Sequence, residues 1–74
     1  MQENSTTKSG LSQRVVCRGI PYSIEILHRK GQEDWTVEVI DTVGKKSVWK
    51  NTARDDAFAL VDAITHIHGL QTTN

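Results

Sequence analysis

The side chains best suited to metal binding or nucleophilic catalysis are a single cysteine, Cys17, and three histidines, His28, His66 and His68. On a helix, His66 and His68 point about 200° away from each other, so they cannot bind one ion together. The sequence has no C-x-x-C or H-x-x-x-H spacing, and those are the spacings typical of zinc sites. We therefore predict no metal site and no cofactor.

Candidate catalytic groups are also sparse. A cysteine nucleophile needs a histidine base, and no neighbour of Cys17 in the sequence supplies one, although a histidine could meet it in space. Glu25 and Glu38 could lie opposite each other on adjacent strands. Paired carboxylates on an open sheet face lack the pocket that acid–base catalysis requires. We therefore expect a protein that is not an enzyme.

Length and charge restrict the class of protein. The 74 residues include nine basic and nine acidic side chains, so the formal net charge is zero. This length fits one domain, and such a small domain is often stabilised by oligomerisation. A lone cysteine suits a reducing compartment, and no signal peptide or membrane span is evident. These features favour a cytoplasmic protein with no membrane partner.

Alternating apolar residues predict the strands. Four segments show strand patterns, at residues 14–18, 22–29, 35–41 and 47–51. The first is either a separate edge strand or the bent half of a longer strand, because Gly19 and Pro21 interrupt it. The next two alternate with period two around a glycine-containing turn, which is the pattern of a hairpin.

The apolar spacing changes after residue 56 and predicts a helix. Positions i, i+3, i+4, i+7 and i+11 form the stripe Ala57, Leu60, Val61, Ile64 and His68. Thr52 stands at the expected N-cap with Asp55 three residues later, and Gly69 is a natural C-terminal end. We expect this stripe to pack on the sheet.

These elements predict an α+β domain of two layers. A three- or four-stranded antiparallel sheet carries one C-terminal helix on one face, in the order β-β-β-α or β-β-β-β-α. The domain spans residues 14–70, between disordered tails at residues 1–13 and 71–74. The helix should cover the sheet face that bears Tyr22, Ile24, Ile26, Trp35, Val37 and Val39.

The outer sheet face is the leading candidate for function. Leu27, Ile40 and Trp49 fall on this face, and exposed apolar patches of this kind mark protein contacts. A one-residue slip of the last strand would instead place Trp49 in the core. We favour a non-enzymatic interaction module that binds a protein partner or a second copy, through this face or through an unpaired edge strand.

Nucleic-acid binding is the alternative hypothesis. Basic and aromatic residues gather around the last strand, at Lys45, Lys46, Trp49, Lys50 and Arg54. Basic side chains position phosphates, and an aromatic ring can stack on a base. Glu25 and Glu38, expected on the same sheet face, would repel a phosphate backbone, so this hypothesis ranks second.

Residues 35–64 also carry a resemblance. Its features are Trp35 opening a strand, Asp41 before the turn Gly44-Lys45-Lys46, Trp49 on the next strand, and a helix with Ala57 and Ala63. This arrangement resembles the AP2-type DNA-binding domain and is similar to small bacterial strand-strand-strand-helix domains such as HicB-like antitoxins. The AP2-type resemblance implies DNA contacts by Trp35, Lys45, Lys46 and Trp49. Similar architecture by itself does not imply similar function.

Overall fold

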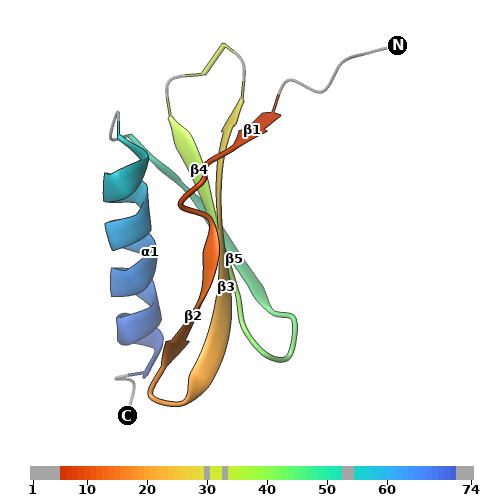
Figure 1. Ribbon diagram of the computed structural model, residues 1–74, viewed down its shortest axis with the longest axis vertical. Helices are drawn as coiled ribbons and strands as arrows, with labels where there is room; N and C mark the ends of the chain where they lie inside the picture. The colour runs from red at the N-terminus through yellow and green to blue at the C-terminus, as the bar shows by residue number, and fades with distance from the viewer. Residues whose placement is uncertain (1–5, 30, 33, 53–54, 72–74) are drawn as a thin grey trace.

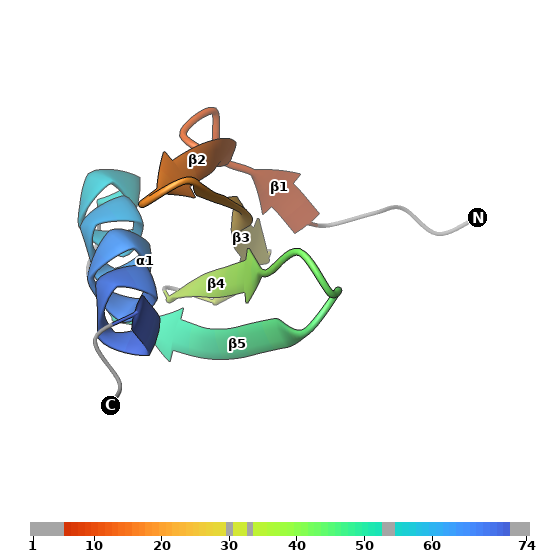
Figure 2. The same ribbon diagram turned by 90° about the horizontal axis from the view of Figure 1, so that it is seen from below.

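The computed structural model describes residues 6–29, 31–32, 34–52 and 55–71, which form one sheet and one helix (Figure 1). The elements are β1 (Thr6–Lys8), β2 (Gln13–Cys17), β3 (Ile20–Arg29), β4 (Trp35–Ile40), β5 (Lys46–Asn51) and α1 (Asp56–Gln71). Every strand pair is antiparallel, and the sheet curves around the helix (Figure 2). The predicted two-layer α+β fold with one C-terminal helix is confirmed.

β1 and β2 share one edge of β3. The sheet order is β1-β3-β4-β5, and β2 also pairs with β3. β1 pairs with residues 27–29 and β2 with residues 20–24, so the two strands lie end to end. The predicted disordered tail at residues 1–13 is therefore wrong for its described part, residues 6–13. Residues 1–5 and 72–74 lie outside the described residues.

The link between β1 and β2 explains why a polar segment is ordered. The Ser9 N–H donates to the Ile26 carbonyl at 2.8 Å, and the Ile26 N–H donates to the Ser12 hydroxyl at 3.0 Å. The Ser9 hydroxyl donates to Asp56 in the first turn of α1 at 2.6 Å, while Leu11 packs against the core. The polar composition of residues 6–13 did not predict an ordered segment. Their order comes mainly from hydrogen bonds to backbone groups of β3 rather than from burial of apolar side chains.

The β2–β3 hairpin accounts for Gly19 and Pro21. Arg18 and Gly19 both have positive φ, 55° and 79°, as a two-residue type I′ turn requires. Ladder bonds alternate outward from that turn, so the Pro21 nitrogen points away from β2. β4 has already ended at Ile40, opposite Ser23. The proline therefore costs the sheet no ladder hydrogen bond.

The core joins large sheet side chains to small helix side chains. Its buried members are Tyr22, Ile24, Ile26, Val37 and Val39 from the sheet and Ala59, Ala63 and Ile67 from α1. Trp35 packs against this cluster and is half-buried. The sheet face predicted to meet the helix is thus correct. The alanines let the helix backbone approach a sheet face that is already filled by branched side chains.

The helix turns a different stripe toward the sheet than the one predicted. Ala59, Ala63 and Ile67 face inward, whereas Ala57 and Val61 of the predicted stripe are exposed. Apolar residues lie around most of the helix circumference, so their spacing alone does not select the inward face. The residues that face inward are those whose size fits the space left by the sheet side chains.

Both predicted helix ends are wrong by a few residues. α1 begins at Asp56, and the Ala57 N–H donates to the Asp55 carboxylate at 2.9 Å. Asp55, rather than Thr52, is therefore the capping residue. The helix continues through Gly69 to Gln71, because Gln71 bonds to β2 and holds the last turn in place.

Candidate functional site

Trp49 does not lie on the outer sheet face. It pairs with Val37 and points to the helix side of the sheet, as Trp35 does. Its indole N–H donates to the Asp62 carboxylate at 2.6 Å, and its ring centroid lies 4.6 Å from that of His66. The predicted outer patch therefore loses Trp49, and the alternative register, with Trp49 toward the core, is correct.

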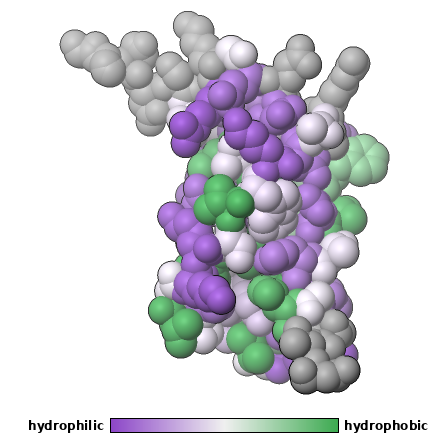
Figure 3. All heavy atoms as spheres, turned by 180° about the vertical axis from the view of Figure 1, so that it is seen from behind, coloured by the Kyte–Doolittle hydropathy of each residue, from purple (hydrophilic) through white to green (hydrophobic). Residues whose placement is uncertain are grey.

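The outer sheet face is dominated by balanced charges. Leu27 and Ile40 lie on it, both half-buried. Glu25 and Glu38 are directly opposed on β3 and β4, as expected. Two ion pairs flank them, Lys8–Glu25 at 2.9 Å and Lys46–Glu38 at 3.4 Å. The outer sheet face therefore lacks the continuous apolar patch that the sequence suggested. The β5 side of the molecule, seen from behind in Figure 3, is likewise mostly hydrophilic with separate apolar spots.

The basic and aromatic residues of the nucleic-acid hypothesis are divided between two faces. Lys46 and Lys50 lie on the outer face, opposite residues 40 and 36 of β4, and Lys45 lies in the preceding turn. Trp49 lies on the helix side, against α1. Arg54 falls outside the described residues. The structure therefore does not bring the tryptophan and the lysines together on one surface.

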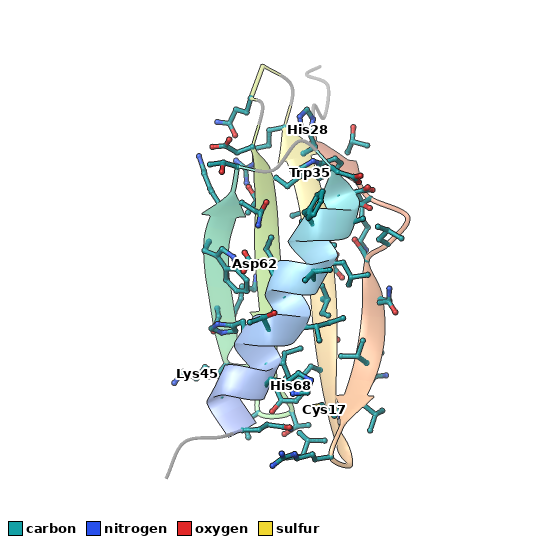
Figure 4. All side chains as sticks on the ribbon, turned by 90° about the vertical axis from the view of Figure 1, so that its left-hand side faces the viewer. Cys17, His28, Trp35, Lys45, Asp62 and His68 are labelled. Atoms are coloured by element: carbon teal, nitrogen blue, oxygen red, sulfur yellow. The ribbon has the colours of Figure 1, made fainter. Side chains whose placement is uncertain are left out.

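Cys17 and His68 meet at the C-terminal end of α1 (Figure 4), where Sγ lies 4.0 Å from Nε2. The nearer contact is to Gln71, whose amide oxygen accepts a hydrogen bond from the Cys17 thiol at 2.9 Å. The Gln71 amide nitrogen donates to the Cys17 carbonyl at 2.7 Å and to the Tyr22 hydroxyl oxygen at 3.3 Å. These bonds fasten the helix to β2. No group of three or more potential metal ligands occurs among the described residues.

The carboxylates of α1 are turned toward the sheet. Asp56 and Asp62 are the charged residues of this helix. The Ser9 hydroxyl beside Asp56 lowers the pKa of that carboxyl. The Trp49 indole N–H, together with the Asn51 amide at 2.9 Å, lowers the pKa of Asp62. Asp56 therefore contacts the link between β1 and β2, and Asp62 contacts β5.

The side of α1 that faces away from the sheet is unusually apolar. We define the outward helix face as Phe58, Val61, Ile64, Thr65 and His68. Phe58 is 63% exposed, Val61 59% and Ile64 38%. The Thr65 hydroxyl donates to the Val61 carbonyl at 2.9 Å, so its polar group is occupied by the helix itself. A helix that covers a sheet normally turns its charged residues outward; among its described residues, this helix turns none outward.

The apolar surface continues from the helix onto β2. A cavity of about 220 Å³ between the two elements is lined by Val15, Val16, Cys17, Ile64, Ile67 and His68. Val15 and Cys17 lie on the helix side of β2 and pack against the core, so the apolar surface reaches from the outward helix face to this sheet edge. One signal in the sequence could have revealed this surface: residues 57–71 contain no Lys, Arg or Glu.

No family model, curated protein or solved structure matches this chain at a significant level. The part of the chain that the structure describes has no helix long and apolar enough to cross a membrane. The outward helix face differs from an ordinary surface helix because it exposes Phe58, Val61 and Ile64.

Proposed function

We propose that this protein is a non-enzymatic interaction module that associates with a second copy of itself through the outward helix face. The supporting observation is that Phe58, Val61 and Ile64 are exposed on a helix whose charges point toward the sheet. Burial of apolar surface is the dominant favourable contribution to most protein–protein association. A partner surface here displaces water without desolvating a charged side chain of the helix.

The spacing of the outward residues suits a helix pair. Phe58, Val61, Thr65 and His68 recur at intervals of three, four and three residues, the seam that two packed helices share. In an antiparallel pair about a twofold axis, each Val61 faces the other Thr65, and each Phe58 faces the other His68. Such an interface is self-complementary. The zero net charge of the chain also removes long-range repulsion between copies.

The edge strands are poor surfaces for self-association. An antiparallel pair of β5 strands centred on Val48 would place Lys46 of one copy opposite Lys50 of the other. Like charges directly opposed on neighbouring strands destabilise the pairing, and charged edges are a common protection against it. The helix therefore fits a second copy better than the unpaired edge considered from the sequence.

The size of this surface sets the expected strength. A helix of 16 residues is about 24 Å long, whereas a standard stable interface buries about 800 Å² on each partner. The outward helix face takes up only one side of this helix, so we expect an interface below the standard size. We expect a dissociation constant on the order of 10 μM.

Sedimentation velocity over about 5 to 500 μM protein tests the proposal. The wild-type sedimentation coefficient should rise with concentration, and Val61→Glu should keep the protein monomeric, because its carboxylate would be buried in the pair. Val43→Glu is the matched control, since Val43 is 84% exposed in a turn, compared with 59% for Val61. A wild type that stays monomeric throughout, or equal effects of the two variants, contradicts the proposal.

A further inference from the structure

Among the described residues, no strand pairs with the backbone hydrogen-bonding groups on the free edge of β5. β5 is the last strand in the sheet order, and the described residues place no strand beyond it (Figure 2). The Asp41 N–H donates to the Lys45 carbonyl at 3.0 Å, and the ladder bonds alternate from there. Ser47 and every second residue after it therefore bond to β4, whereas Lys46, Val48 and Lys50 direct their N–H and C=O groups to the free edge.

The outer side of this edge is basic. Lys46 and Lys50 flank Val48 on the outer sheet face. The Lys46 side chain is 51% exposed even though it contacts Glu38, and Lys50 is exposed. A strand added beside β5 would place its own side chains directly opposite these lysines. Acidic residues at those positions would be stabilised, whereas basic ones would be repelled.

The inner side of the same edge borders a shallow groove of about 550 Å³ between β5 and α1. Its lining residues are Ser47, Val48, Trp49, Asp62, Thr65 and His66. The Asp62 carboxylate in this groove already accepts hydrogen bonds from Trp49 and Asn51. The rings of Trp49 and His66 supply the remaining surface for contact with an added strand. The Nε2 atom of His66 is buried and has no hydrogen-bond partner among the described residues. Apolar side chains of an added strand would enter this groove.

We propose that β5 is a docking edge for an extended acidic segment of a partner protein, which binds as an additional strand. Its acidic side chains face Lys46 and Lys50, and the apolar side chains between them enter the groove beside Trp49. Strand addition of this kind combines main-chain hydrogen bonds with alternating side-chain specificity. A second copy does not fit, because its β5 would place lysine opposite lysine. Thr65 lines the groove beside this edge and also belongs to the outward helix face.

An NMR titration in the Val61→Glu background tests this proposal separately from self-association. The probe is the acetylated peptide Thr-Glu-Val-Glu-Val-Glu-Thr. We expect it to shift the amides of residues 46–51 and the indole of Trp49. A peptide with lysine in place of each glutamate should bind at least about tenfold more weakly. Alternate N-methylation, which removes strand pairing but keeps the charge, should abolish binding. Equal binding of the N-methylated peptide, or shifts that lie elsewhere, would overturn the proposal.

Variants of the edge give a second test. Val48→Pro removes an N–H that points to the free edge and leaves the β4 ladder intact, so it should weaken peptide binding at least about tenfold. Lys50→Glu, which does not depend on tolerance of proline, should weaken it about tenfold. Arg14→Glu makes the same charge change on exposed β2 and should leave affinity within about twofold. Equal losses for Lys50→Glu and Arg14→Glu would overturn the proposal.

Nucleic acid provides the competing outcome. A short oligothymidine, titrated under the same conditions, should leave the amides of residues 46–51 unchanged at moderate salt, because Trp49 lies on the opposite face from Lys46 and Lys50. If the oligonucleotide shifts those amides at lower concentration than the acidic peptide, with an affinity that falls steeply as salt rises, the docking proposal is wrong.

Discussion

The two faces of α1 reverse the usual relation between residue size and burial. The inward face buries the small residues Ala59 and Ala63 together with Ile67, whereas the outward face exposes Phe58 and Val61. The sheet already supplies large branched side chains, so the helix backbone must lie close to them, and close packing leaves little room for large helix residues. Which apolar residues of the helix are buried depends on how well their shape fits the sheet as well as on their hydrophobicity.

The flanks of the helix differ from both faces because they carry its polar contacts. Asp62 accepts hydrogen bonds from Trp49 and Asn51 on the β5 side, and Gln71 joins the helix to Cys17 on the β2 side. These contacts fix the rotation of the helix about its axis. They hold the large apolar residues outward, where a partner can reach them.

The largest expected difference between the faces concerns two isoleucines. Ile67 is 1% exposed and Ile64 38%, so Ile67→Ala leaves a cavity and should lower the free energy of unfolding by about 2–5 kcal/mol. Ile64→Ala should lower it by less than about 1 kcal/mol. Urea denaturation of dilute protein measures both values. Equal losses would mean that the two faces are not energetically distinct.

A smaller effect is expected on the β5 flank. Asp62→Asn keeps the shape of the side chain but removes the charge that accepts the Trp49 and Asn51 hydrogen bonds. Because the site is partly open to solvent, we expect a loss of about 1 kcal/mol at neutral pH. Urea denaturation at pH 7 measures it, with Asp34→Asn in the β3–β4 connection as the control. A variant as stable as the wild type would show that this flank does not hold the helix in place.

The same carboxylate predicts a pH dependence. The hydrogen bond from Trp49 lowers the pKa of Asp62 below its ordinary value of 3.8. The stability gained from this group is therefore present above that ordinary value and is lost as the pH falls through the lower, folded-state pKa. The free energy of unfolding of the wild type should fall over this acidic range, and that of Asp62→Asn should fall by less.

The smallest effect on stability is expected on the outward face. Phe58→Gln should change the unfolding free energy of dilute protein by less than about 0.5 kcal/mol, because Phe58 is largely exposed. Thermal melting at low and high concentration sharpens the comparison. The wild-type midpoint should rise with concentration if the outward face is covered in a dimer, and the variant midpoint should not. A concentration-independent wild-type midpoint would contradict burial of this face.

The candidate site could be predicted only in part. The sequence shows that residues 57–71 contain no Lys, Arg or Glu, and that Lys46, Val48 and Lys50 alternate along one strand. The two proposed surfaces depend on these features. The sequence also placed Glu25 and Glu38 opposite each other on the outer face. It could not place Trp49, because a shift of one residue in a short strand exchanges the two faces of the sheet.

The sequence by itself determined the elements whose signals are local. Period-two alternation predicted β3 and β4, the change of period predicted α1, and short connections made the strands antiparallel, because each signal depends only on near neighbours in the chain. Only the tertiary structure decided the rotation of α1, the face of Trp49 and the order of residues 6–13. Those features depend on space and hydrogen-bond partners supplied by distant residues, such as the Ile26 backbone for Ser9 and the Trp49 indole for Asp62.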